Sequence, residues 1–495
     1  MVFSSHLFLF VFLPLALAVY WTLPRRAKNL GLVLLSYIFY GWENPAFVVL
    51  MAASTVVDYG CGLVLAGARP GLRSRGEAPA LLDEGGTRSR RQRIALCVSI
   101  ASNLSLLGFF KYFDFGVDSW NRLAVALGAD AATSDAVLRI VLPLGISFYT
   151  FQSMSYTIDV YRGRCRALRD PIDFACFVAM FPQLVAGPIV RFREIADQLE
   201  ERRHSLAKAA RGVSFFALGL AKKVLLANPC GKVADLAFDA ATRTPLDAWL
   251  GALAYAFQIY FDFSGYSDMA IGLGLLLGFT LPKNFDSPYR ARSVTDFWRR
   301  WHMSLSRWLR DYLYIPLGGN RKGPRRTYVN LMLVMLLGGL WHGAAWTFVV
   351  WGGMHGVALA VERAFGIDRG ARSGERSGPR HALGVATTFV FVLFTWVVFR
   401  APTLGDAILY WRDMLGLGLL GTSSDTSALV AGALRQTFHL GALLLAALIV
   451  WTAPQTDAWT RRLTAPRAAL TLLLFAAAVL LMETQGYNPF IYFIF

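Results

Sequence analysis

Residues 296–320 read DFWRRWHMSLSRWLRDYLYIPLGGN, and residues 329–351 read VNLMLVMLLGGLWHGAAWTFVVW. The second stretch is apolar and long enough to cross a bilayer, which takes roughly 20 such residues. It contains His342, and an ionisable side chain inside an apolar run is costly and usually functional. The first stretch contains His302 among several arginines, in a chain with only seven histidines. The two stretches therefore indicate chemistry carried out within or beside a membrane.

The composition of the whole chain agrees with that interpretation. Hydrophobic residues make up 55% of 495 residues and the mean hydropathy is +0.45, which excludes an ordinary soluble globular protein. We expect an all-α polytopic membrane protein of about ten to twelve membrane helices in a single domain, 1–495. The clearest apolar runs are 6–23, 92–113, 136–158, 247–280, 329–351, 383–399, 433–452 and 467–482, and shorter or interrupted runs are 29–42, 46–67, 172–190 and 208–229.

The charge pattern predicts the topology. The net charge of +17 comes from basic residues clustered between apolar runs, as in cytoplasmic loops, so we expect no nucleic-acid partner. Basic loops on both sides of 172–190 predict a re-entrant segment, and such irregular backbone needs a surrounding protein cavity. Both chain termini are predicted outside the cytoplasm. The five cysteines form no C-x-x-C pair, so we expect neither disulfides nor a zinc site.

A helical stripe accounts for much of the stretch around His302. The spacing of its aromatic and leucine side chains predicts an amphipathic helix at the membrane interface. The stripe comprises Trp298, Trp301, His302, Leu305, Trp308, Leu309 and Tyr312, and the opposite face carries Arg299, Arg300, Ser304, Ser306, Arg307, Arg310 and Asp311. His302 then points towards protein or lipid, and spacing alone leaves a packing histidine as probable as a functional one.

His342 lies near the middle of the run 329–351. Gly339 and Gly343 form a small-xxx-small pair that allows another backbone to approach closely. A buried imidazole needs hydrogen-bond partners. One alternative is that His342 forms a hydrogen bond between two helices. The other is that it acts as a general base lining a polar passage, a role that the near-neutral pKa of histidine suits.

Two further segments hold polar or aromatic groups in apolar surroundings. In the first, Asp262 and Tyr266 share a helix face while Asp268 points elsewhere, and this arrangement favours structural pairing or cavity lining over catalysis and matches no metal site. The second is the uncharged aromatic tail, 486–495. We expect the tail to dock in a groove of this protein or a partner, or else to lie in the membrane interface.

Five motifs make the chain resemble the membrane-bound O-acyltransferase family along almost its whole length. They are FPQLVAGPIVR (181–191), QIYFDFSGYSDMA (258–270), DFWRRWH (296–302), YLYIPLGGN (312–320) and GGLWHGAAW (338–346). The resemblance implies a ring of tilted helices around a central tunnel, with a catalytic core at about 172–362. It also implies that His342 is catalytic, that His302 is the second motif histidine, and that Tyr492 is a possible acyl relay.

The implied activity is O-acetyl transfer across the inner membrane of a bacterium, onto an exported polysaccharide such as alginate. The implied donor is acetyl-CoA or another acetyl thioester from the cytoplasm, with no bound cofactor or metal. A periplasmic or membrane-anchored acetyltransferase partner would complete transfer to the polymer. Tunnel or donor-binding candidates are Asp262, Tyr266, Asp268, Trp298, Arg299, Arg300 and Trp341.

Two alternatives remain open at this stage. One is an O-acyltransferase with another acyl group or acceptor, for example D-alanylation of a cell-wall polymer. The other is a transporter or flippase for an anionic glycan, with Asp262, Asp268 and His342 as an ion pathway. The sequence contains no apparent internal repeat of the kind common in transporters.

Overall fold

The described chain consists of helices and connecting loops. The computed structural model describes residues 1–71, 79–128, 140–185, 187–367, 378–417, 432, 435–484 and 486–489, and none of these forms a strand. The chain divides into two compact units: Met1–Ala209 with Leu273–Pro282, and Ala210–Gly272 with Lys283–Phe495. The prediction of an all-α polytopic membrane protein is confirmed.

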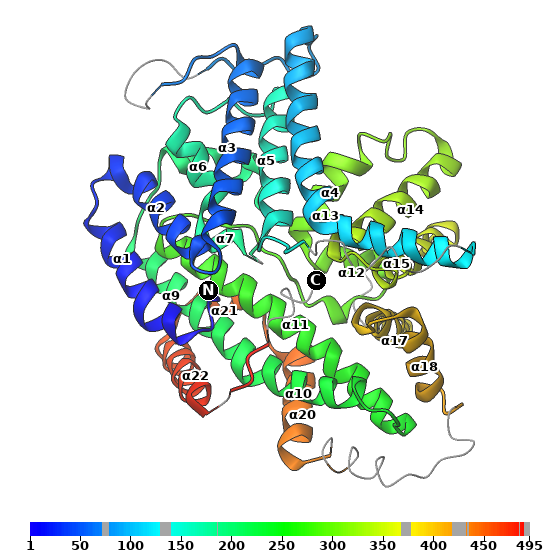
Figure 1. Ribbon diagram of the computed structural model, residues 1–495. Coiled ribbons are helices and arrows are strands. Elements are labelled where there is room, and N and C mark those ends of the chain that lie inside the picture. Colours follow the sequence, from blue (N-terminus) through cyan, green and yellow to red (C-terminus); the bar gives the residue numbers. More distant parts are fainter. Residues whose placement is uncertain are drawn as a thin grey trace. The chain divides into compact units, whose positions relative to one another are not determined.

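The first unit is built around three neighbouring helices, α3, α4 and α5, which run side by side (Figure 1). Local signals define their ends: Asn44 caps the start of α3, and Ser89 and Gln92 form a capping box at the start of α4. The helices of this unit are η1 (Leu7–Phe12), α1 (Leu13–Thr22), η2 (Arg25–Ala27), α2 (Lys28–Gly41), α3 (Pro45–Ala66), α4 (Arg90–Ala126), α5 (Ile146–Tyr161), α6 (Pro171–Ala179), α7 (Phe181–Leu184) and α8 (Phe192–Glu200).

The second unit holds both histidine motifs. Its core is dominated by aromatic side chains, among them Tyr255, Tyr289, Trp351 and Trp396. Its helices are α9 (Leu206–Ala221, which begins in the first unit), η4 (Lys222–Ala227), α10 (Asn228–Phe238), α11 (Pro245–Leu276), η5 (Pro288–Arg290), α12 (Val294–Arg300), α13 (Met303–Leu309), η6 (Arg310–Tyr314), α14 (Gly323–His342), α15 (Trp346–Ala364), α17 (Pro379–Arg400), α18 (Leu404–Met414), α20 (Thr437–Thr452), α21 (Thr456–Thr460) and α22 (Ala465–Thr484).

The number of long apolar helices is smaller than expected. Five helices in the described chain can cross a bilayer by length and composition: α3, α4, the continuous stretch Leu206–Phe238, α17 and α22. Two shorter apolar helices are Leu7–Thr22 and Thr437–Thr452. The run 172–190 is divided between the short α6 and α7, and polar residues interrupt the apolar sequence of α11, so neither is among the five. The total of ten to twelve spans stays a prediction.

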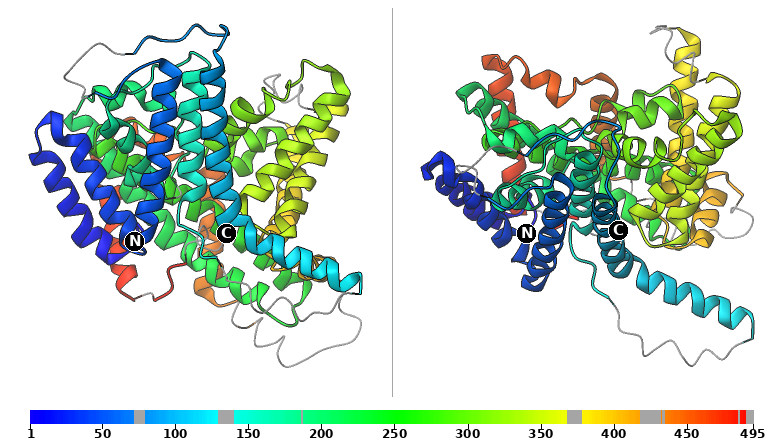
Figure 2. Two further views of the ribbon diagram at one scale, coloured as in Figure 1. Left: turned by 45° about the horizontal axis from the view of Figure 1, so that its top comes forward. Right: turned by 90° about the horizontal axis from the view of Figure 1, so that it is seen from above.

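The boundary predicted after the run 92–113 was wrong. The predicted run ends at residue 113, but α4 continues to Ala126, and its C-terminal part extends away from α3 and α5 in both views of Figure 2. Aspartate is a weak helix former, but a single aspartate does not by itself end a helix. Here Gly128, with a φ of 92°, follows the last turn.

The apolar run 329–351 is not one helix but a helical hairpin. α14 ends at His342, Gly343 is extended, and α15 begins at Trp346. The two helices pack closely because Gly339 has no side chain: a Cβ there would lie 2.2 Å from the carbonyl oxygen of Phe348. The predicted close approach at Gly339 is confirmed, within the hairpin.

Candidate active site

His342 occupies the end of α14, where the hairpin turns. Its side chain is buried, with ring centroids 5.3 Å from Trp351, 5.4 Å from Phe399 and 5.1 Å from Trp341. The neighbouring Gly343 packs against the ring of Phe348 in the same turn. The histidine is therefore held by aromatic rings at a helix end rather than in the middle of a span.

His302 lies in a break between α12 and α13. The predicted continuous helix was wrong here, because His302 adopts a left-handed conformation with φ 42° and ψ 54°. A non-glycine residue in this region costs roughly 1–2 kcal/mol, so the surrounding contacts must hold it there. The break also explains why Ser304 and Asp311 are buried, although the helical stripe placed them on the polar face.

Asn284 anchors His302. Its Oδ1 accepts a hydrogen bond from the backbone N–H of Ser304 at 3.3 Å and lies 3.1 Å from His302 Nδ1. Because a backbone N–H can only donate, the atom facing both groups is the amide oxygen, and His302 Nδ1 must donate to it. Asn284 Nδ2 in turn donates to Ser267 Oγ at 2.9 Å, so α11 supports the arrangement.

The second nitrogen of His302, Nε2, is thereby left without a proton. Burial lowers the pKa of His302, which lies outside the five candidate spans, well below its ordinary value, and nearby His342 lowers it further. The neutral ring carries its proton on Nδ1, so Nε2 presents a lone pair. This buried Nε2 has no hydrogen-bond partner among the described residues. The two histidine rings lie with their centroids 6.3 Å apart.

A cavity of about 260 Å³ opens beside His342. Its walls are mostly apolar and come from α12, α13, α14 and α15, and its polar residues apart from His342 are Ser306, Arg310 and Tyr314. The apolar lining includes Trp298, Leu305, Leu309, Met335, Gly338 and Trp351. An apolar cavity with a few polar groups is typical of small-molecule sites.

The remaining candidates of the basic stretch have separate positions. Trp298 lines the cavity and its Nε1 donates to Nδ1 of the buried His355 at 3.3 Å. Trp341 is buried beside the two motif histidines, with ring centroids 6.1 Å from His302 and 5.1 Å from His342. Arg299 is exposed, whereas Arg300 pairs with Asp296 at 2.9 Å. Only the two tryptophans are therefore close to the histidines.

The acidic cluster of α11 is held in ion pairs. Asp262 pairs with Lys223 at 2.6 Å, and both side chains are almost fully buried. Asp268 pairs with Lys222 at 2.6 Å and accepts a hydrogen bond from Thr456. Tyr266 is fully buried. Sequence reasoning expected pairing here but missed the lysine partners, which belong to η4.

The start of the C-terminal tail docks on the second unit. Tyr487 donates a hydrogen bond to Asp235, Asn228 Nδ2 donates to the Tyr487 carbonyl at 3.3 Å, and Lys223 donates to the carbonyl of Pro489. Residues 486–489 thus bind η4 and α10. This agrees with the expectation that the tail docks on this protein. Tyr492 lies outside the described residues.

Two buried polar residues of this region were not predicted from the sequence. Asn284 belongs to none of the five motifs. The only indication in the sequence was a polar amide side chain shortly before the basic stretch. His355, which lies outside the five motifs, is fully buried and its ring centroid lies 4.9 Å from that of Trp351. Among the described residues no group of three histidine, cysteine or acidic side chains could hold a metal ion.

The geometry invites comparison with known proteins. The sequence model of the membrane-bound O-acyltransferase family matches residues 166–367, which include both histidines and every residue lining the cavity. The chain is 44% identical to a probable alginate O-acetylase of Pseudomonas putida, over the full length of both chains. The chain belongs to the membrane-bound O-acyltransferase family.

Other relatives differ in the acceptors that their names state. A peptidoglycan O-acetyltransferase of Helicobacter pylori is 38% identical over 84% of this chain and 80% of its own length. A teichoic acid D-alanyltransferase of Streptococcus thermophilus is 30% identical over 52% of this chain and 68% of its own length. This protein is therefore a multi-pass membrane O-acyltransferase.

Proposed function

We propose that this protein transfers acetyl groups for the O-acetylation of an exported polysaccharide, alginate or a similar polymer. The observation that carries the proposal is His342 at the wall of an apolar cavity, with the lone pair of His302 Nε2 buried nearby. The names of the full-length relatives support acetyl as the group and a polysaccharide as the acceptor. D-alanyl transfer has weaker support, from partial and more distant similarity.

His342 is suited to act as the general base. It takes the proton of the acceptor hydroxyl while the hydroxyl oxygen attacks the acetyl carbonyl carbon. The carbon–sulfur bond of the thioester then breaks, and the imidazolium returns the proton to the departing thiolate. The aromatic rings around His342 exclude water, which suppresses hydrolysis of the donor.

His302 is suited to orient the acceptor rather than to donate to a developing negative charge. Its Nδ1 proton is engaged by Asn284, so its Nε2 accepts a hydrogen bond from the hydroxyl or from a water molecule. An acceptor held in this way needs less ordering in the transition state.

The donor in this proposal is acetyl-CoA or another acetyl thioester that approaches from the cytoplasm. The exposed Arg299 supplies positive charge that favours an anionic donor. The protein would lie in the bacterial inner membrane with both termini on the periplasmic side. A periplasmic or membrane-anchored acetyltransferase would complete the transfer, with Tyr492 as the relay, and the docked residues 486–489 support a tail position on this protein.

The transporter alternative loses its main argument in this structure. It required Asp262 and Asp268 as carriers of an ion pathway, and both carboxylates are engaged by lysines. A buried pair of this kind holds its charges in place.

The experiment compares cells that produce wild-type protein with cells that produce His342→Ala at the same level. We expect the secreted polymer to keep its yield and to lose its acetyl groups. Loss of export with normal acetylation of the retained polymer would overturn the proposal in favour of transport. Polymer that keeps its acetyl groups and carries less D-alanine would indicate the other acyl group.

A further inference from the structure

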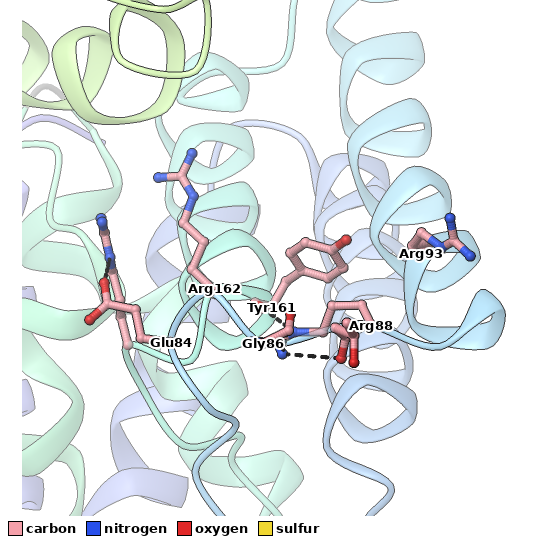
Figure 3. A pocket seen from close by; sticks show the side chains of 9 residues that line it. Glu84, Gly86, Arg88, Arg93, Tyr161 and Arg162 are labelled. Carbon is pink, nitrogen blue, oxygen red and sulfur yellow. Dashed lines mark hydrogen bonds and ion pairs between the residues drawn. The ribbon is translucent and has the colours of Figure 1, made fainter.

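A basic pocket lies in the first unit, on residues that the proposed chemistry does not use. It has a volume of about 720 Å³ and is formed where the loop before α4 meets the end of α5. Figure 3 shows Glu84 and Arg162 on one side of it, Arg93 of α4 on the other, and Arg88 with Tyr161 between them.

The pocket carries an excess of positive charge. Four arginines line it, Arg88, Arg93, Arg162 and Arg164, against one carboxylate, Glu84, which pairs with Arg164 at 3.1 Å. Arg88 donates to the carbonyl oxygens of Tyr161, Gly86 and Asp83, which fix its position, and no carboxylate in the described part of the chain forms an ion pair with it. Arg93 is exposed and makes no ion pair within the described part of the chain.

An apolar groove adjoins this pocket and shares Arg93 with it. The groove has a volume of about 550 Å³ and is lined by Arg90, Arg93, Ile94, Cys97, Val98 and Ala101. Residues 90, 94, 97, 98 and 101 follow helical spacing, so the groove runs along one side of α4 from its basic end. Ile94 is 52% and Val98 46% exposed, and α4 is a candidate membrane span of which only 22% of the most apolar window is buried.

We propose that this paired pocket and groove bind one anionic phospholipid. The arginine pocket takes the phosphate and glycerol of the headgroup, and an acyl chain lies along Ile94, Val98 and Ala101. Guanidinium groups bind phosphate with directional, charge-assisted hydrogen bonds. A basic cluster at the end of a membrane helix faces the headgroup layer, where anionic lipids gather.

The groove is the reason to prefer a lipid over a free phosphate compound. A soluble phosphate would use the arginines and leave Ile94 and Val98 in contact with solvent or bulk lipid. The start of α4 does not supply the site, because the capping box of Ser89 and Gln92 already satisfies backbone groups there. Charge and apolar surface therefore meet at Arg93, as they do in a phospholipid.

Native mass spectrometry of the full chain in detergent tests the proposal. Phosphatidylglycerol and phosphatidylcholine with identical acyl chains are added separately to wild-type protein and to Arg93→Gln. Arg122→Gln, which removes an exposed charge near the other end of the same helix, is the matched control. Each basic residue near an anionic headgroup contributes about fivefold in affinity. We expect Arg93→Gln to lose about fivefold for phosphatidylglycerol, and Arg122→Gln to bind as wild type.

Two further arms test the groove and the source of the phosphate. Ala101→Trp fills the groove without changing charge, and we expect it to weaken phosphatidylglycerol binding as well. Glycerol 3-phosphate at equal concentration should leave the lipid bound. Displacement by glycerol 3-phosphate would overturn the lipid in favour of a soluble phosphate, and equal binding of phosphatidylcholine, or equal loss in Arg122→Gln, would overturn the site.

Discussion

Two regions of the second unit bury titratable side chains among apolar helices, and they do so in opposite ways. The lysine–aspartate region joins Lys223 to Asp262 and Lys222 to Asp268, each at 2.6 Å. The histidine region places His302 and His342 with their ring centroids 6.3 Å apart, and His302 Nε2 has no hydrogen-bond partner among the described residues. In the first region each lysine is paired with an aspartate, whereas in the second the Nε2 atom of His302 has no hydrogen-bond partner among the described residues.

This difference distinguishes titratable side chains that are buried as part of the fold from those that are buried for a reaction. A buried charge that is paired and hydrogen-bonded can remain as part of the fold, whereas a buried polar atom without a partner is costly and needs a reason. In the histidine region a cavity of about 260 Å³ adjoins His342, and the proposed function places the substrate there. Substitutions in the two regions should therefore change different properties of the protein.

The largest effect is expected at His342. His342→Gln should lower the rate of acetyl transfer by about 10²–10⁴, the usual contribution of a general base. His355→Gln is the matched control, because His355 is equally buried but does not line the cavity. Initial rates of acetyl transfer by the two purified variants test this. Equal losses of rate would mean that the histidine region, like the lysine–aspartate region, has only a structural role.

The next effect is one of stability at Lys223. Lys223→Met leaves the Asp262 carboxylate buried without its cation, and removing one partner of a buried pair destabilises by about 3–5 kcal/mol. The double variant Lys223→Met with Asp262→Leu should recover most of that loss, because no charge stays uncompensated. Thermal unfolding in detergent measures both, and a double variant no more stable than the single one would contradict the pairing.

Gly339 tests the hairpin that positions His342. Gly339→Ala puts a Cβ 2.2 Å from the Phe348 carbonyl oxygen, so α14 and α15 must separate. We expect a loss of about 1–3 kcal/mol in stability, together with lower activity. At Gly353 the nearest atom would be 3.6 Å away, so Gly353→Ala should leave stability and activity unchanged within error. Identical behaviour of the two variants would show that the hairpin contact is unimportant.

The smallest predicted effect is at Asn284. Asn284→Ala removes the acceptor that holds the proton on His302 Nδ1, and the rate should fall about tenfold, the equivalent of one hydrogen bond of about 1.4 kcal/mol. Ser267→Ala removes only the outer partner of Asn284 and should lower the rate less. A rate unchanged in Asn284→Ala would show that the tautomer of His302 plays no part.

The sequence predicted the helical class, the burial of both motif histidines and the close approach at Gly339. It could not predict the break at His302, because helical spacing extends a stripe through any residue that suits it. The left-handed conformation depends on Asn284, eighteen residues earlier in the chain, which is a tertiary contact. The turn after His342 was hidden for a related reason: glycine and alanine in an apolar run fit a continuous helix and a tight hairpin equally well.

The lysines that pair with the aspartates of α11 could not be predicted for the same reason. Lys222 and Lys223 stand in an apolar run that looked like a membrane segment, and only the packing of η4 against α11 joins them to Asp268 and Asp262. Long-range pairing of this kind leaves no periodic signal. The resemblance to a family indicated which histidines matter, and the structure adds how Asn284 supports one of them.

Chemical rescue tests the role of His342 most directly. Acetyl transfer by purified His342→Ala protein is measured with increasing concentrations of free imidazole, beside His355→Ala as the control. The account predicts that His342→Ala loses the activity and regains part of it as imidazole enters the space left beside the cavity, while His355→Ala gains nothing. A His342→Ala protein that transfers acetyl groups at the wild-type rate without imidazole would contradict it.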